Sequence, residues 1–210
     1  FENLPDVQVF LYEPAGAPAA GKMAKGKQRP NMTIGRASLL SLMNRYLKAV
    51  MDPFISLLEI HKLMYFMQEA GEELNLRYTK APYGPYAENL RHVFNLIEGH
   101  FIKGFADAED RPDTKIEIIS EAVKEADLYL KNHSETNKKF DRVADLIKGF
   151  ETPFGMELLS TVHWVAAHEE ADTPEKAVAA TYAWNNRKNM FQKEQIQIAW
   201  DTLLEKGWIS

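Results

Sequence analysis

Cysteine is absent from the 210 residues of this chain. Disulfides, thiolate zinc sites and a cysteine nucleophile are therefore excluded, and the absence fits a reducing cytoplasm. The apolar runs are far shorter than the roughly 18–20 residues that a membrane span needs. No apolar secretory segment opens the chain. We therefore expect a cytoplasmic protein with no membrane partner.

Sequence motifs for catalysis and cofactor binding are also missing. The chain has neither a G-x-x-x-x-G-K-[ST] phosphate loop nor a G-x-G-x-x-G turn. Its six histidines form no H-E-x-x-H pattern. His163 and His168 are five residues apart, which places them on poorly matched faces of a helix. We therefore expect no cofactor, no metal site and no catalytic residue, so that this segment is not an enzyme.

The charge of the chain is unevenly distributed. The net charge is −5, yet residues 15–36 carry five basic side chains and no acidic one. Residues 107–127 carry eight acidic side chains against three basic ones. Because Lys and Arg supply most of the affinity for a phosphate backbone, the acidic body favours a basic protein partner over direct binding to nucleic acid. The alternative interpretation is a solvated face that charge keeps soluble.

Apolar residues recur at helical spacing through most of the chain after residue 33, which predicts a mostly α fold. We expect a multi-helix bundle with a few short strands. Asp52 and Pro53 suit the N-cap and first residue of a helix that Gly71 would end. The expected helices cover residues 34–50, 53–70, 86–97, 120–130, 135–148, 154–168, 174–184 and 192–206. The expected short strands cover residues 76–82, 115–119 and 207–210, and the last of these makes the C-terminal unit winged-helix-like.

The segment Pro82-Tyr83-Gly84-Pro85-Tyr86 is a turn that few backbone conformations satisfy. Both prolines fix their own φ and push the preceding residue away from the α region. Gly84 can adopt backbone angles that other residues resist. Pro85 suits the first turn of the helix expected over residues 86–97. Tyr83 and Tyr86 would then be held at a helix entrance, where they either pack the turn or form a recognition surface.

Six stretches of the sequence together resemble one protein family. They are residues 61–71 (HKLMYFMQEAG), 78–90 (YTKAPYGPYAENL), 98–102 (EGHFI), 140–146 (FDRVADL), 154–159 (FGMELL) and 161–164 (TVHW). Over roughly residues 33–210 the chain resembles the C-terminal domain of DarG antitoxins, which counter DarT toxins. The first two stretches are also similar, more loosely, to the helical Panacea antitoxin domains.

This resemblance implies a function. DarT toxins ADP-ribosylate bases in single-stranded DNA. DarG antitoxins combine an N-terminal macrodomain that removes ADP-ribose from DNA with a C-terminal domain that binds the toxin. We therefore expect an antitoxin domain that inhibits a DarT-type toxin by direct contact, with acidic side chains in place of DNA phosphates and aromatic rings in place of stacked bases. The candidate partner-binding residues are Tyr83, Tyr86, Glu88, Asp107, Glu109, Asp110 and Asp113.

Two other functions stay open at this point. The C-terminal unit and the basic residues of the N-terminal region could bind nucleic acid and regulate an operon. ADP-ribose hydrolysis could also reside in this segment, although the missing motifs argue against it.

The resemblance also suggests how the chain is divided. Residues 1–13 include a short β-prone run and would be the tail of an upstream macrodomain, because Phe1 is not an initiator residue. Residues 14–33 would form a flexible basic linker. Residues 34–149 would form the helical toxin-binding body, and residues 150–210 the helical, winged-helix-like subdomain.

Overall fold

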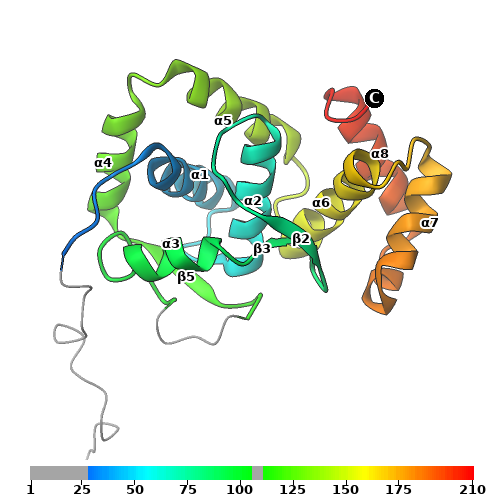
Figure 1. Cartoon of the computed structure of the whole chain (residues 1–210), viewed down its shortest axis with the longest axis horizontal. Coiled ribbons are helices and arrows are strands. Elements are labelled where there is room, and N and C mark those ends of the chain that lie inside the picture. The colour runs from blue at the N-terminus through cyan, green and yellow to red at the C-terminus, as the bar shows by residue number, and fades with distance from the viewer. Residues whose placement is uncertain (1–27, 106–110) are drawn as a thin grey trace, which may run out of the picture.

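The computed structural model describes residues 28–105 and 111–210. The prediction of a mostly α fold with a few short strands is confirmed (Figure 1). In chain order the elements are α1 (Ile34–Val50), β1 (Ile55–Ser56), α2 (Leu57–Glu69), β2 (Tyr78–Ala81), β3 (Gly84–Ala87), α3 (Leu90–Ile97), β4 (Ile102–Lys103), β5 (Lys115–Ile118), α4 (Ser120–Leu130), α5 (Ser134–Leu146), α6 (Pro153–His168), α7 (Pro174–Trp184), the 3-10 helix η1 (Asn186–Met190) and α8 (Lys193–Glu205). The expected strand and linker before residue 28 lie outside the described residues. No helix in the described part of the chain is both long and apolar enough to cross a membrane.

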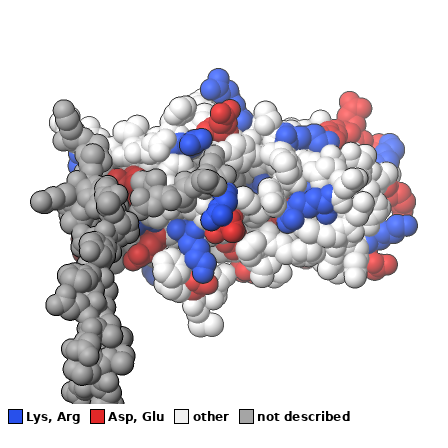
Figure 2. All heavy atoms as spheres, turned by 90° about the horizontal axis from the view of Figure 1, so that it is seen from below, with Lys and Arg blue, Asp and Glu red and all other residues white. Residues whose placement is uncertain are grey.

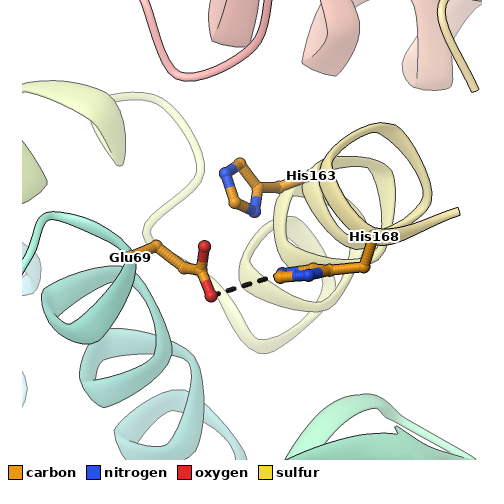
Figure 3. Close-up of side chains that lie close together, drawn as sticks. All are labelled: Glu69, His163 and His168. Carbon is orange, nitrogen blue, oxygen red and sulfur yellow. Dashed lines mark ion pairs between the residues drawn. The ribbon is translucent and has the colours of Figure 1, made fainter. Parts of the chain in front are cut away.

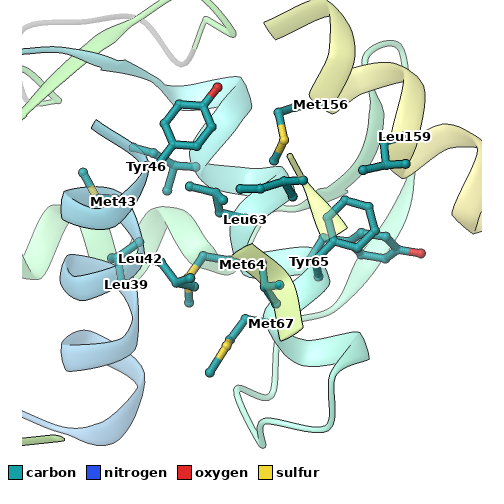
Figure 4. Packing of buried hydrophobic residues seen from close by; sticks show 14 of the residues in the cluster. Leu39, Leu42, Met43, Tyr46, Leu63, Met64, Tyr65, Met67, Met156 and Leu159 are labelled. Atoms are coloured by element: carbon teal, nitrogen blue, oxygen red, sulfur yellow. The ribbon is translucent and has the colours of Figure 1, made fainter. Parts of the chain in front are cut away.

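Helix α2 is the centre of the fold. Its residues 57–67 are all buried, because α1, α5, α6 and β3 pack around it. Most of its side chains are apolar around the whole circumference, and a helix of this kind is typically enclosed in this way. Figure 4 shows the α1 and α2 side chains meeting in one core that continues to α6. The labelled members are Leu39, Leu42, Met43, Tyr46, Leu63, Met64, Tyr65, Met67, Met156 and Leu159.

The start of α2 differs from the sequence prediction. The N-cap is Ser56 rather than Asp52, and Pro53 lies outside the helix. Ser56 forms a capping box with Glu59: the Ser56 side chain accepts from the Glu59 backbone N–H (3.3 Å), and the Glu59 carboxylate accepts from the Ser56 N–H (2.8 Å). Asp52 instead accepts a bond from the Phe54 N–H (2.9 Å) in a local turn. Both residues are good caps, but only Ser56 has an acidic residue three positions later to complete the box.

The Tyr-Gly-Pro segment forms a β-hairpin, so the prediction of a helix from residue 86 is wrong. Lys80 pairs with Pro85 and Ala81 with Gly84 across β2 and β3, and α3 begins only at Leu90. Pro82 suits the second position of the connecting turn and Gly84, at φ 95°, the fourth. A two-stranded ribbon also tolerates the missing N–H of Pro85. Figure 1 shows the hairpin between α2 and α6, and both helices contact β3.

Strand β5, predicted over residues 115–119, joins β1 and β4 in a three-stranded antiparallel sheet. The segment just before β5 covers the N-terminus of α2. The N–H groups of Leu57 and Leu58 donate to the carbonyls of Thr114 (2.9 Å) and Pro112 (3.0 Å). Donors that a helix start leaves unpaired are satisfied in this way. This contact places Asp113 and Lys115 beside the beginning of α2.

The closing strand expected at residues 207–210 is absent from that segment, so the strand that made the expected C-terminal unit winged-helix-like does not form there. Gly207 adopts φ 65°, and the Trp208 N–H donates to the Leu203 carbonyl (2.8 Å). This bond ends α8 in a glycine C-cap of the Schellman type. The turn directs the Trp208 ring into the core, where it meets Phe66 and His163 edge to face. The glycine C-cap and the buried ring therefore both favour this turn over a closing strand.

Candidate functional site: a groove beside Tyr83

A groove of about 820 Å³ lies beside Tyr83, between α1, β1, the segment before β5 and the start of α6. We call it the Tyr83 groove. Its walls are formed by Tyr46, Val50, Asp52, Phe54, Ser56, Leu58, Glu59, Tyr83, Arg111, Pro112, Asp113, Lys115, Glu151, Thr152, Pro153 and Arg187. A smaller pocket of about 250 Å³ adjoins it and shares Leu58, Tyr83 and Pro112. Residues from both predicted segments, 34–149 and 150–210, therefore form one concave surface.

The charges along the Tyr83 groove are of both signs. Arg111 pairs with Asp113 at 3.7 Å, and both side chains are largely exposed. The Lys115 ammonium lies 5.6 Å from the centre of the Phe54 ring, and Phe54 is 42% exposed. A rim of mixed charges around exposed aromatic surface is typical of protein–protein interfaces. A channel for nucleic acid would present mainly basic side chains.

One wall of the groove is fixed by a buried hydrogen bond between α1 and α2. The Tyr46 hydroxyl donates to the Glu59 carboxylate at 2.6 Å. Burial, together with this bond to the carboxylate, raises the pKa of Tyr46 far above its usual range. Because Glu59 also closes the capping box with Ser56, the start of α2 and the end of α1 are held as one unit.

The turn that carries Tyr83 is docked onto the C-terminal helices. The Trp184 indole N–H donates to the Ala81 carbonyl (2.9 Å), and the Asn185 amide donates to the Pro82 carbonyl (3.2 Å). The Arg187 guanidinium lies over the Tyr83 ring, 4.3 Å from its centre. Three contacts therefore restrain one exposed turn, so Tyr83 is presented to the groove in a fixed orientation.

A buried ionic network lies beneath this turn. Glu157 is 1% exposed and accepts from Arg187 Nε (3.2 Å), Arg187 Nη2 (3.0 Å) and Lys188 Nζ (2.7 Å). The carboxylate raises the pKa of Arg187. Burial lowers the pKa of the fully enclosed Lys188, although Glu157 opposes this effect. A buried carboxylate is tolerated only when its oxygen atoms are paired in this way.

Lys62 links the hairpin to the same buried region. It is buried, and its Nζ donates to the Pro85 carbonyl at 2.6 Å. Burial, and then repulsion by Lys188, lowers the pKa of Lys62 to about 7, with Glu157 acting in the opposite direction. The amine therefore donates to Pro85 without a full positive charge at neutral pH.

The low pKa of Lys62 leads to a test by pH. Between pH 7 and the ordinary lysine pKa of 10.5, the unfolded chain binds a proton at Lys62 that the folded chain does not hold. The free energy of unfolding must then rise with pH in this window, by at most about 1.4 kcal/mol per pH unit. We expect Lys62→Met to remove this rise, as measured by urea unfolding at several pH values. Lys176→Met is the matched control, because that ammonium is exposed and pairs with Asp172 (2.7 Å). Equal slopes in wild type and Lys62→Met would show that Lys62 keeps an ordinary pKa.

Tyr86 lies on β3 and packs against His61. The two rings are stacked with centres 4.3 Å apart. Burial lowers the pKa of His61 to about 3, so the imidazole is neutral at physiological pH. Both residues line the smaller pocket, which is mainly apolar. Tyr86 thus closes the pocket next to the groove.

The structure brings some of the predicted partner-binding residues together. Tyr83 and Asp113 line the Tyr83 groove, and Tyr86 lines the adjoining pocket. Glu88 is exposed just after β3 and lines neither cavity. Asp107, Glu109 and Asp110 lie outside the described residues. The partner-binding role of all seven stays a prediction.

The buried ionic network around Glu157 was not predicted from the sequence. Lys62 and Glu157 both occur inside otherwise apolar helical stretches, HKLMYF and FGMELL. A charged residue enclosed by apolar neighbours on a buried helix requires a partner, and this signal was available in the sequence. The identity of the partners depends on the hairpin docking, which the sequence does not show.

A second cluster lies where α2 and α6 end. Glu69, His163 and His168 point toward one another in Figure 3, and their ligand-type atoms all lie within 4.8 Å of one another. The prediction that the two histidines occupy mismatched faces overlooked Glu69, which approaches from α2. His168 Nε2 lies 3.3 Å from the Glu69 carboxylate. Among the residues that the structure describes, these three side chains form a group whose residue types and spacing could hold a metal ion.

Comparison with known proteins gives one class of relative. No family model matches the chain. The chain is similar to curated bacterial proteins that bear the name DNA ADP-ribosyl glycohydrolase. The protein of Thermus aquaticus is 42% identical over 98% of this chain, and those of Mycobacterium bovis and Mycobacterium tuberculosis are each 37% identical over 97% of it. The chain spans 56% of the first protein and 61% of the other two, so it matches little more than half of their length.

These relatives correct the prediction that this segment is not an enzyme. The match covers nearly the whole chain, and the matched proteins are named as glycohydrolases. The prediction rested on absent motifs, and short motifs identify only those active sites that are built around them. The comparison agrees with the resemblance to DarG proteins drawn from the sequence stretches above.

Proposed function

We propose that this chain is part of a DNA ADP-ribosyl glycohydrolase of the DarG type and corresponds to its toxin-binding, C-terminal portion. In this proposal the chain binds a DarT-type DNA ADP-ribosyltransferase and inhibits it by direct contact. The extent of the similarity to glycohydrolases supports the first statement. The observation that carries the second is the rigidly held Tyr83 at the edge of a large groove of mixed charge.

The Tyr83 groove has the features of a protein-binding hot spot. Tyrosine and arginine are the residues most enriched where truncation costs binding energy, and here Tyr83 and Arg187 are stacked on each other. Their positions are fixed before any partner arrives, which lowers the entropy lost on association. The exposed Phe54 ring adds apolar surface, and the Arg111–Asp113 pair lies at the rim. We propose that residues 34–149 and 150–210 both contribute to this surface.

Competition with single-stranded DNA is the proposed mode of inhibition. A protein channel for single-stranded DNA combines basic side chains with surfaces on which bases stack. Asp107, Glu109, Asp110 and Asp113 would pair with the basic side chains, and Tyr83 would occupy a stacking position. Asp113 lines the same groove as Tyr83, so the two features can meet one partner together.

Direct binding to nucleic acid has less support from the described surface. Figure 2 shows Lys and Arg interspersed with Asp and Glu on the face in view. A DNA-binding face usually gathers its basic residues in a patch or stripe. The proposal of a protein partner therefore agrees better with the charges that this face presents.

The proposal predicts a specific loss of toxin binding. We expect Tyr83→Ala to weaken the complex by tenfold or more, because truncation of a hot-spot residue costs about 2 kcal/mol or more, and about 1.4 kcal/mol corresponds to a tenfold change in affinity. Charge reversal at Asp107, Glu109, Asp110 and Asp113 should weaken it as well, increasingly so at low salt. Calorimetric titration with a DarT-type toxin measures the binding. Transfer of ADP-ribose to single-stranded DNA measures the inhibition, which excess DNA should relieve.

Tyr129→Ala is the matched control for this experiment. Tyr129 is a partly exposed tyrosine of α4 that stacks on His133 and lies outside the groove. Its truncation should leave toxin binding unchanged. If Tyr83→Ala and the charge-reversal variant fold normally and still inhibit the toxin, the groove is not the interface. Steep salt-dependent binding of the wild-type chain to DNA alone would instead favour a nucleic-acid-binding module.

A further inference from the structure

The smaller pocket beside the Tyr83 groove lies between α2 and the β2–β3 hairpin, which are neighbours in Figure 1. Its volume is about 250 Å³, whereas pockets for drug-sized ligands measure roughly 300–1,000 Å³. It therefore has room for one ring or one side chain rather than for a dinucleotide. Leu57, Leu58 and Ala81 are part of its mainly apolar wall. Two consecutive residues of α2, His61 and Lys62, add ionisable nitrogen atoms to that wall.

The imidazole of His61 has an unused nitrogen atom. His61 is 3% exposed, and its Nδ1 has no hydrogen-bond partner among the residues that the structure describes. The ring itself is held in place, because it stacks on Tyr86 and meets Phe94 edge to face, with centres 6.2 Å apart. Buried polar atoms of native proteins are nearly always paired. The unpaired Nδ1 therefore marks a place where a bound group would gain a hydrogen bond.

Lys62 has no carboxylate partner of its own. Its Nζ donates to the uncharged Pro85 carbonyl, and an ammonium group has two further protons to donate. Glu157 attracts Lys62, but that carboxylate already pairs with Arg187 at 3.0 Å and with Lys188 at 2.7 Å. One carboxylate therefore serves three basic side chains. A second carboxylate near Lys62 would balance the charge of this enclosed region.

We propose that the smaller pocket binds a carboxylate carried on an apolar body, with Lys62 and His61 as the donors to its oxygen atoms. The apolar wall accommodates the body. The carboxylate supplies the acceptor that His61 Nδ1 lacks and the negative charge that Lys62 lacks.

An acidic side chain of the protein partner is the source of this carboxylate, and this part of the inference rests on the proposed function. The smaller pocket shares Leu58, Tyr83 and Pro112 with the Tyr83 groove, so a partner seated in the groove lies beside the pocket. The rim of the groove carries both Arg111 and Asp113, which suits a partner surface of mixed charge. The partner would thus insert one acidic side chain between α2 and the hairpin.

Titration of the chain with sodium benzoate tests the pocket without any protein partner, because benzoate combines one ring with one carboxylate. We expect saturable binding by calorimetry. The imidazole signals of His61 should shift in NMR spectra, whereas those of His133, which lies outside the pocket, should not. Benzyl alcohol has the ring without the charge and should bind at least about tenfold more weakly. Absence of saturable benzoate binding, an unshifted His61 or equal binding of the two compounds would overturn the proposal.

Two variants test the donors separately. Lys62→Met and His61→Phe each keep a side chain of similar size, and each should weaken benzoate binding by about tenfold or more, because a hydrogen bond to a charged group is lost. Lys176→Met is the matched control and should bind as the wild type does, since that ammonium is exposed and pairs with Asp172. Circular dichroism verifies the fold of each variant. Equal binding by the wild type and both pocket variants would mean that benzoate occupies another place, which overturns the proposal.

Competition with a DarT-type toxin tests the source of the carboxylate. The toxin should displace benzoate from the wild type, and Lys62→Met should weaken the toxin complex by about tenfold. If the toxin binds while benzoate stays in place, the proposed function stands but the partner does not fill the pocket. If benzoate binds and the toxin forms no complex, the proposed function fails and the toxin is overturned as the source.

Discussion

Substitution of Glu157 by alanine is expected to lower the free energy of unfolding by about 3–5 kcal/mol, the loss typical when one partner of a buried ion pair is removed. Glu157 is 1% exposed, and its carboxylate is the acceptor for both Arg187 and Lys188. Arg187 can turn toward solvent, but Lys188 is completely enclosed and would keep an unpaired ammonium. Urea unfolding monitored by tryptophan fluorescence measures the change.

Two further variants separate charge from packing. Glu175→Ala removes an exposed carboxylate from the first turn of α7 and should change stability by no more than about 0.5 kcal/mol. The double variant Glu157→Met with Lys188→Met should recover most of the loss, since a buried pair can often be replaced by apolar side chains of similar volume. If the double variant is less stable than Glu157→Ala alone, the loss comes from packing and not from the unpaired charge.

The secondary structure of this protein followed largely from local sequence signals. Helical periodicity predicted α6 and α8, and Thr173-Pro174 marked the start of α7 as the structure has it. The errors arose where two good local signals competed. Asp52 and Ser56 are both N-cap residues, and the capping box with Glu59 favours Ser56. Pro85 suits a helix start, but the turn at Pro82 and Gly84 pairs it into β3.

The candidate site was less predictable because its geometry depends on contacts between distant residues. The sequence singled out Tyr83 and Asp113, which the structure places in one groove. It gave no sign that Trp184 would hold the Ala81 carbonyl, a bond between residues 103 positions apart. Spacing within one helix also could not show that Glu69 of another helix lies beside His163 and His168. Periodicity determines which face of an element is buried, but not which element covers it.

The second large effect is expected for Gly84→Ala. Gly84 has φ 95°, a region that costs an L-residue about 1–2 kcal/mol. An added Cβ would also lie 3.1 Å from Thr161 Oγ1 and 3.2 Å from Lys62 Nζ. Neither neighbour can easily retreat, because Thr161 donates to the Glu157 carbonyl (2.7 Å) and Lys62 to the Pro85 carbonyl (2.6 Å). Overpacking of this kind adds about 1–3 kcal/mol to the loss of stability.

Gly71→Ala isolates the two contributions to that loss. Gly71 has nearly the same backbone angle, φ 94°, and nothing lies within 4 Å of the position of its Cβ. It should therefore lose only the backbone part, and Gly84→Ala should be the less stable variant in urea unfolding. Gly84→Ala should also weaken toxin binding, because the displaced turn carries Tyr83, whereas Gly71→Ala should bind normally. Equal losses of stability in the two variants would mean that Lys62 and Thr161 move aside readily. The hairpin would then be loosely docked, and the rigid presentation of Tyr83 on which the proposed interface depends would be lost.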